Sequence, residues 1–335
     1  MKKIDKAKVR RILVITLSNI GDIILTTPVV QSLVEEFKDA KIDIMVSPNG
    51  RELFSSNENI KDVIIYDKKS SPFSKFKLFL NLRGKKYDLV VDLRNTILPL
   101  ILGAKFITNP FRHDQKTRLH KKRIHLGRLE EIGIDTAKNY FYIPIKGDDK
   151  EYIDKVLFEF RGKPFIVVSP GAKSHVKRWP LKNFANLCDM LKRSLGYEIV
   201  LIGDANDRIV IERVLFYMKT KPLNLIEKTN IGQLAYLVKK AALLITNDSA
   251  PLHVGSAVDA KILAFFGPTD EKKYGPLTKS QSRVLRNNMK CSPCEVPQCI
   301  NRDNKYECLK TISVDQAFKV ARELLGHENT INANR

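Results

Sequence analysis

The chain has 335 residues, of which 43% are hydrophobic and 8% aromatic, so it can bury a sizeable core, and its length favours two domains. Its 58 Lys and Arg outnumber its 37 Asp and Glu to give a formal charge of +21, which favours polyanionic partners: nucleic acid, anionic lipid or a phosphorylated substrate. No apolar run approaches the ~20 residues of a membrane-spanning helix or forms the core of a signal peptide, so we expect a cytoplasmic protein.

Short β-branched runs alternate with amphipathic segments through the first half. These runs are RILVITL, KIDIMVS, DVIIYD and YDLVVDL, and the alternation predicts βαβ units around a parallel sheet. After a helical pattern at 149–160, the alternation restarts with KPFIVVSPGAK, YEIVLIGD, LNLIEK, AALLITND and AKILAFFGPTD. These nearly continuous apolar runs indicate strands covered on both faces by helices. We therefore predict an α/β protein with two doubly wound domains, divided near residue 160.

Positive charge is concentrated in two segments of the first half. Segment 68–86 carries seven basic and no acidic residues, with Phe73, Phe76 and Phe79 at helical spacing. Segment 112–128 adds seven basic residues, one acid and three of the six histidines. Each segment is either a solvated helix face or a contact surface for a polyanion.

Ligands of open parallel sheets bind beyond the carboxyl ends of the strands, so candidate residues should follow the strands. A strand at 243–246 leads into a helix for which Ser249 is the expected N-cap, and Ala250 leaves the first backbone amides approachable. Free amides and the helix dipole favour an anion there, and His253, one turn on, could reach it. The alternative is an ordinary capped helix with a buried histidine.

Three further strand ends carry polar residues. The loop SPGAKSHVKRWP holds Ser169 and the cation Lys177, and it predicts either a phosphate-binding loop without P-loop spacing or a solvated basic turn. Asp22 follows the first strand beside a single glycine, so the dinucleotide fingerprint is absent and Asp22 is either functional or a helix cap. Asp204 and Asp207 follow YEIVLIG and could accept hydrogen bonds from a ribose or cap a helix.

The cysteines form a separate cluster. Cys291, Cys294, Cys299 and Cys308 are spaced C-x2-C-x4-C-x8-C, whereas Cys188 lies alone in an apolar helical pattern and is expected in the core. In a cytoplasmic chain four neighbouring thiols favour a structural metal over disulfides, although the spacing matches no standard zinc pattern. Metal, disulfides and free thiols all stay open, and the metal's identity is unknown.

Four stretches in this order and spacing resemble glycosyltransferase family 9, the heptosyltransferases that build the inner core of lipopolysaccharide. They are SNIGDIILTTPVVQSL, SPGAKSHVKRWP, NDSAPLHVGSAV with FFGPTD, and the tail from CSPCEVPQC to CLKTISVDQAF, and the resemblance covers nearly the whole chain. It implies the GT-B fold, two Rossmann-like domains facing across a cleft. The acceptor domain would be 1–160 and the nucleotide-sugar domain 161–312, with a last helix at 313–327 packing back toward the first domain.

The resemblance also implies a reaction, the inverting transfer of heptose from ADP-heptose. Asp22 matches the family's general base, and Asp248, Ser249 and Ala250 match the turn that holds the donor diphosphate. His253 and Ser169 lie alongside, Lys177 neutralises phosphate charge, and no metal is needed for catalysis. Two positions depart from the family, because Ala250 replaces a glycine and Asp207 stands in for a glutamate that binds the ribose.

The implied acceptor is an anionic lipopolysaccharide precursor, which would bring the protein to the inner-membrane surface as a peripheral enzyme without a nucleic-acid partner. One alternative is a transferase of the same fold with another nucleotide sugar or a protein acceptor. A nucleic-acid or regulatory binding protein is the second, and the absence of RRM, KH and helix-turn-helix signatures counts against it. Donor sugar, acceptor position and oligomeric state are left open by the sequence.

Overall fold

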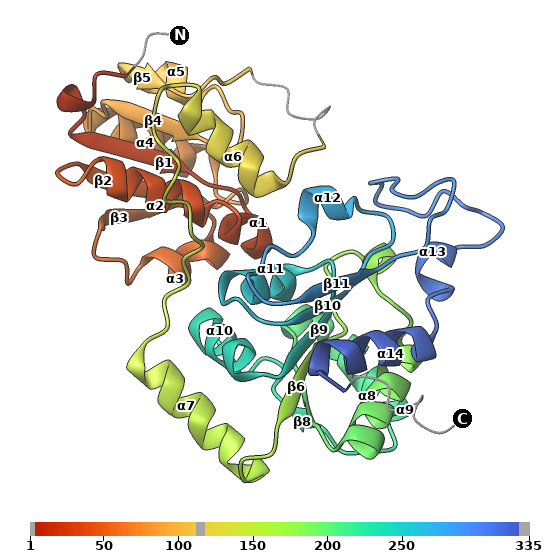
Figure 1. The fold of residues 1–335 in the computed structure, drawn as a ribbon. Coiled ribbons are helices and arrows are strands. Elements are labelled where there is room, and N and C mark those ends of the chain that lie inside the picture. Colours follow the sequence, from red (N-terminus) through yellow and green to blue (C-terminus); the bar gives the residue numbers. More distant parts are fainter. Residues whose placement is uncertain (1–3, 112–117, 328–335) are drawn as a thin grey trace. The chain divides into compact units, whose positions relative to one another are not determined.

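The computed structural model describes residues 4–111 and 118–327, and it divides the chain into two compact units, 1–144 and 145–335 (Figure 1). Each unit is a parallel sheet with helices packed on it, as the alternating pattern predicts. The predicted α/β class with two doubly wound domains is therefore confirmed. None of the helices within the described ranges is both long and apolar enough to cross a membrane.

The first unit contains a five-stranded parallel sheet in the order β3-β2-β1-β4-β5. Its strands are β1 (Arg11–Ile15), β2 (Lys41–Val46), β3 (Ile60–Ile65), β4 (Leu89–Asp92) and β5 (Phe106–Ile107). Its helices are α1 (Ile20–Ile24), α2 (Thr27–Glu36), α3 (Arg51–Phe54), α4 (Pro72–Gly84), α5 (Leu98–Leu102) and α6 (Lys121–Glu130). The strand order reverses between β1 and β4, whose ends pair Ile15 with Asp92, so the predicted Asp22 loop follows a strand at this switch point.

The second unit contains a six-stranded parallel sheet in the order β11-β10-β9-β6-β7-β8. Its strands are β6 (Phe165–Ser169), β7 (Glu198–Leu201), β8 (Leu223–Asn224), β9 (Leu243–Asn247), β10 (Ile262–Phe265) and β11 (Ser282–Leu285). Its helices are α7 (Gly147–Leu157), α8 (Leu181–Leu195), α9 (Arg208–Tyr217), α10 (Ile231–Lys240), α11 (Ala250–Ala257), α12 (Glu271–Tyr274), α13 (Glu307–Lys310) and α14 (Val314–Leu325). Two apolar clusters cover its faces, one with α8, α9 and α14 and the other with α7, α10 and α11.

The boundary between the units lies earlier than predicted, between residues 144 and 145 instead of near 160. Helix α7 belongs to the second unit because Ile153 joins that unit's core, Asp149 accepts a hydrogen bond from Asn230, and Asp154 pairs with Lys240. The helical pattern of α7 is visible in the sequence, but its partners lie about 80 residues further along the chain.

The last helix lies on the second sheet. The predicted helix at 313–327 is α14 (Val314–Leu325), and its expected packing toward the first domain stays a prediction. Ala317, Ala321 and Leu324 are buried in the cluster that covers the second sheet, beside α8. Packing there removes the apolar stripe of α14 from water, so this helix closes its own unit.

Candidate functional site

The candidate site in the second unit lies where β6 and β9 end side by side. The two strands are neighbours in the sheet and pair Ser169 with Thr246. The chain runs outward from β6 through β7 to β8 and then returns to β9 on the other side of β6. The strand order therefore reverses between β6 and β9. Open parallel sheets bind ligands at such a switch point. The fold therefore brings the predicted Ser169 loop and the Asp248-Ser249 turn to one place.

The loop after β6 is held by hydrogen bonds to its own backbone. Asn247, which is fully buried, donates its Nδ2 to the carbonyl oxygens of Pro170 (2.9 Å) and Gly171 (3.3 Å) and accepts from the backbone N–H of Trp179 (3.0 Å). Arg178 donates two hydrogen bonds to the carbonyl of Ala172, at 2.9 and 2.7 Å. These bonds fix both ends of the loop, so Arg178 serves the loop instead of facing solvent.

Lys177 meets Asp248 across this junction. Its Nζ lies 2.7 Å from Oδ2 of Asp248 and 5.8 Å from the ring centroid of Tyr274. The carboxylate is buried while the ammonium stays partly exposed. The predicted diphosphate-binding turn and its counter-charge are therefore already paired with each other.

Ser249 precedes α11 as predicted, but its side chain does not cap the helix. The hydroxyl turns back toward β9, 3.2 Å from the hydroxyl of Thr246 and 3.4 Å from the carbonyl of Asn247. The prediction of a side-chain cap was wrong, because oxygens at the end of β9 compete with the helix amides for the Ser249 hydroxyl. Ala250, half-buried, begins the eight-residue helix, and His253 lies buried one turn in.

Asp207 reaches the same loop from a different strand. Its carboxyl group packs on Gly171, where an added Cβ would lie 2.2 Å from the carboxyl carbon, so only glycine permits this approach. Burial and the nearby Asp204 carboxylate raise the pKa of Asp207, and the Asp204 backbone N–H and Arg178 oppose the rise. The third strand end thus contributes a carboxyl group to the loop that follows Ser169.

Asp22 lies in the first turn of α1, at the switch point of the first sheet. Its Oδ2 accepts a hydrogen bond from Asn19 Nδ2 (2.9 Å), and its side chain is half-buried. At the end of β4, Asp92 is fully buried and accepts from the backbone N–H groups of Arg94 and Thr96. Asp92 therefore orders its own loop, whereas Asp22 keeps an accessible carboxylate.

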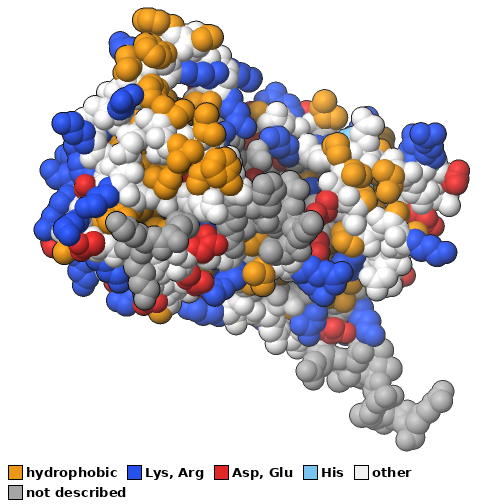
Figure 2. Space-filling model, turned by 90° about the horizontal axis from the view of Figure 1, so that it is seen from above, with side chains coloured by type: hydrophobic (Ala, Val, Ile, Leu, Met, Phe, Trp, Pro, Cys, Tyr) orange, Lys and Arg blue, Asp and Glu red, His pale blue; other side chains and the backbone are white. Residues whose placement is uncertain are grey.

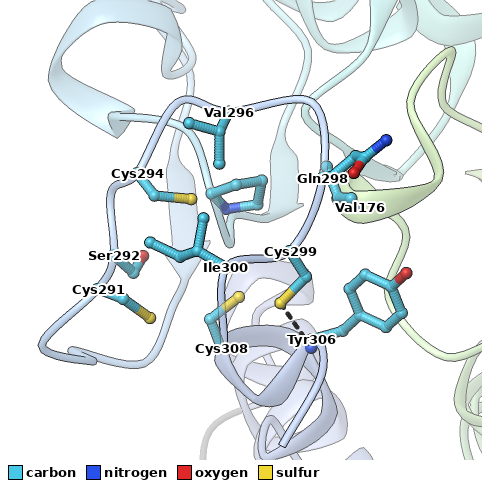
Figure 3. Close-up of a pocket in the computed structure, with 11 residues that line it drawn as sticks. Val176, Cys291, Ser292, Cys294, Val296, Gln298, Cys299, Ile300, Tyr306 and Cys308 are labelled. Atoms are coloured by element: carbon cyan, nitrogen blue, oxygen red, sulfur yellow. Dashed lines mark hydrogen bonds between the residues drawn. The ribbon is translucent and has the colours of Figure 1, made fainter. Parts of the chain in front are cut away.

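The four clustered cysteines line one pocket, together with Pro268, Tyr306 and residues of the 292–300 segment (Figure 3). All four are free thiols. Cys299 Sγ accepts a hydrogen bond from the backbone N–H of Tyr306 at 3.3 Å. Burial is the main cause that raises the pKa of Cys308, and the charges of the other three cysteines raise it further. Among residues 4–111 and 118–327, no three His, Cys, Asp or Glu side chains are arranged to hold a metal ion. The thiols thus share a pocket without forming a ligand set.

This cysteine segment also touches the loop after β6. Tyr306 Oη lies 3.1 Å from His175 Nε2, the two rings meet edge to face, and Val176 lines the cysteine pocket. Trp179 adds a second connection, because its indole N–H donates to the carbonyl of Ile312 at 3.0 Å. The tail of the unit therefore supports the loop that carries Lys177.

Comparison with known proteins gives the family of the chain. Residues 106–305, more than half of the chain, match the family described as glycosyltransferase family 9 (heptosyltransferase). The chain belongs to glycosyltransferase family 9. It is therefore a glycosyltransferase, and the resemblance inferred from its motifs is confirmed.

Individual members of glycosyltransferase family 9 match nearly end to end. Lipopolysaccharide heptosyltransferase 3 of Escherichia coli K12 is 29% identical over 336 residues, covering 91% of this chain and 95% of that protein. The solved structure of the family 9 glycosyl transferase from Veillonella parvula has a TM-score of 0.80 at 28% identity, covering 95% and 98%. The E. coli ADP-heptose heptosyltransferase II structure, at 23% identity, shares the fold with a TM-score of 0.75 and covers 95% and 99%.

Two positioning residues of this family 9 member have no local sequence signal that reveals their role. The apolar pattern marks Asn247 only as the end of a strand and Trp179 only as a helix start. Only the structure shows that Asn247 is fully buried, and that burial indicates its role because buried amides need several partners. The partners of Asn247 are 68 to 77 residues away, and Ile312, the partner of the Trp179 indole, is 133 residues away, beyond any local pattern.

Proposed function

We propose that this glycosyltransferase moves heptose from ADP-heptose to the inner core of lipopolysaccharide, with inversion at the anomeric carbon. The observation that carries the proposal is the convergence of the Lys177 loop, the Asp248-Ser249 turn and Asp207 at one switch point. The names of the E. coli relatives, a lipopolysaccharide heptosyltransferase and an ADP-heptose heptosyltransferase, support the donor and the acceptor. The second unit is the proposed donor domain and the first the proposed acceptor domain.

In the donor domain, Lys177 and the first amides of α11 face the diphosphate in this proposal. Both stabilise negative charge that grows as the nucleotide leaves, so they act on the transition state as well as on binding. Ser249 offers a hydroxyl, His253 and Ser169 stand alongside, and the small Ala250 keeps the backbone close to the ligand. Asp207 accepts from the ribose hydroxyls, since its carboxyl is held beside the loop.

In the acceptor domain, Asp22 is the proposed general base. Its carboxylate removes the proton of the acceptor hydroxyl as that oxygen bonds to C1 of the heptose. The C1–O bond to ADP breaks on the opposite face, and the electron pair leaves with the diphosphate. Such assistance contributes typically ~10²–10⁴-fold, and the alignment of both substrates supplies much of the remaining acceleration.

A thermal-shift and calorimetric panel tests the donor assignment. We expect ADP-heptose to raise the melting temperature more than ADP-glucose, UDP-glucose or GDP-mannose at equal concentration, because a ligand stabilises the state that binds it. A larger shift from another nucleotide sugar would support the alternative of a same-fold transferase with a different donor. If no nucleotide sugar had an effect while an oligonucleotide did, the donor assignment would be wrong.

The proposed place of action is the cytoplasmic face of the inner membrane, because the acceptor is a membrane-embedded polyanion. The net charge of +21 suits an anionic surface. Part of the basic segment 112–128 lies outside the described residues, and Arg128 is buried, where it donates to the carbonyl of Asp92. The segment 68–86 is therefore the better-supported contact.

The expectation of a structural metal at Cys291, Cys294, Cys299 and Cys308 stays a prediction, and no catalytic step depends on it. Thiols are suitable ligands for zinc or iron, but their described positions do not form a ligand set. Metal analysis of the purified protein, with a Cys294→Ser variant beside a Cys188→Ser control, decides the matter. One equivalent of metal lost only in Cys294→Ser supports the site, and metal-free native protein excludes it.

A further inference from the structure

Helix α4 carries apolar side chains on both its inner and its outer face. Leu78, Phe79 and Leu82 pack into the core of the first unit. On the other side Phe73, Phe76 and Leu80 are exposed by 76%, 56% and 51%. Their spacing of three and four residues places them on one stripe of the helix. A helix that is apolar toward solvent as well as toward the core needs a partner for its outer face.

Helix α5 extends this exposed surface. Leu98 and Leu102 pack into the same core cluster as α4, and the two helices contact each other. On its outer side Ile97, Leu100 and Ile101 are exposed by 62%, 49% and 45%. Figure 2 shows hydrophobic side chains gathered on one face of the molecule among Lys and Arg. The six exposed side chains of α4 and α5 are called the apolar ridge below.

Most of the solvent-exposed charged side chains around the apolar ridge are cationic. Lys68, Lys69, Lys77, Arg83, Lys86 and Lys105 are exposed. Between residues 68 and 105 the sequence has two acids, Asp88 and Asp92, and both accept hydrogen bonds from backbone amides. Lys85 is different, because its Nζ pairs with Asp43 at 2.8 Å and Asp62 at 2.5 Å. Exposed cations therefore border the apolar ridge, and the exposed acids beside them are Asp62, which pairs with Lys85, and Asp67, which precedes Lys68 in the chain.

We propose that the apolar ridge inserts into the headgroup and acyl boundary of an anionic lipid bilayer, while the surrounding cations bind the headgroups. Amphipathic elements with a basic border and bulky apolar residues bind membrane interfaces in this way. A second copy of the chain fits less well, since a symmetric contact would oppose cation to cation. Nucleic acid would leave the aliphatic Ile97, Leu100 and Ile101 without a suitable partner. The proposal rests on the proposed function, which supplies a lipid-anchored acceptor.

Vesicle binding by the full chain tests the insertion. The ridge variant Phe73→Gln/Phe76→Gln/Leu80→Gln should bind phosphatidylglycerol vesicles at least tenfold more weakly than the native protein, with an unchanged melting temperature. The matched control Ile209→Gln/Phe216→Gln replaces equally exposed apolar residues of α9 in the other unit and should bind normally. A charge variant, Lys68→Gln/Lys69→Gln/Lys77→Gln, should lose about fivefold per charge, and only at low salt.

Fluorescence separates insertion from surface adsorption. A Phe76→Trp variant should shift its emission to the blue with phosphatidylglycerol vesicles and be quenched by brominated acyl chains. The natural Trp179 is fully buried and should stay constant. Unchanged emission despite vesicle binding would overturn insertion. Normal vesicle binding by the ridge variant would also overturn it. So would a ridge variant that loses self-association or oligonucleotide binding of the native protein but keeps its vesicle binding.

A soluble acceptor distinguishes this proposal from the proposed function. With deacylated acceptor and ADP-heptose, the ridge variant should transfer heptose at the native rate, because no bilayer is involved. If the native protein transfers heptose but does not bind vesicles, only the ridge proposal is refuted. Vesicle binding through the ridge without any heptose transfer would leave the ridge standing and refute the donor and acceptor assignment.

Discussion

Lys177 and Asp248 form an ion pair across the ends of β6 and β9, with 2.7 Å between Nζ and Oδ2. The two residues come from loops that are 71 positions apart, and each lies in a motif expected to contact the donor diphosphate. Because the carboxylate is buried and the ammonium is partly exposed, Asp248 holds the cation at the edge of the proposed site. Asp248 is therefore a positioning residue in our account, acting through Lys177.

Replacing Lys177 tests this arrangement. Lys177→Ala should weaken ADP binding by roughly 10- to 100-fold and adenosine binding far less, as a charge-assisted hydrogen bond is worth about 1.5–3 kcal/mol. The protein should also lose stability, because the buried Asp248 carboxylate loses its partner. Calorimetry with both ligands measures the difference, and the exposed Lys182→Ala at the start of α8 is the control. Equal losses for ADP and adenosine would refute the phosphate role.

Asp22→Asn tests the general base. We expect turnover to fall about a hundredfold or more while ADP-heptose affinity and melting temperature stay near native values, because the amide cannot take up the proton. Asn at this position can still contact Asn19, so the α1 turn should persist. The exposed Asp39→Asn is the matched control. Near-native turnover at saturating substrates would reduce Asp22 to a local hydrogen-bond partner.

The pH dependence of stability tests the environment of Asp207. Its pKa is raised above 3.8, so the stability that this group contributes is complete below that value and is lost as pH rises through the folded pKa. Asp207→Asn removes this loss. The melting-temperature difference, variant minus native, should therefore increase as pH rises above 3.8 and level off beyond the folded pKa, while donor affinity falls. A difference that is constant with pH would contradict a raised pKa of Asp207 in the folded protein.

Asn247→Ala should release the loop after β6. The substitution removes three hydrogen bonds of a fully buried amide and leaves backbone groups unsatisfied, which costs about 1–3 kcal/mol per unpaired group. Lower unfolding free energy in urea should accompany weaker ADP binding, although Asn247 need not touch the ligand. Asn224→Ala, with one local hydrogen bond at the edge strand β8, is the control. Lower stability with native ADP affinity would show that the loop keeps its shape unaided.

Local sequence pattern predicts the long apolar strands such as β6 and β9, and the polar residues at strand ends mark Ser169, Asp207 and Asp248. The edge strands β5 and β11 escape prediction because they are short and only partly buried. The predicted unit boundary and the predicted side-chain cap at Ser249 were wrong, since the boundary depends on partners distant in sequence and the cap on competing oxygens at the strand end. The Lys177–Asp248 pair lies beyond sequence patterns for the same reason.

The most direct test of the central claim is mass spectrometry of a heptose-deficient lipopolysaccharide inner-core acceptor after incubation with ADP-heptose and the purified protein. We expect the acceptor to gain one heptose per ADP released, with β-to-α or α-to-β inversion visible by NMR, and Asp22→Asn to abolish the gain. The account would be contradicted if the acceptor stayed unmodified and ADP-heptose stayed intact while the same protein consumed a different nucleotide sugar.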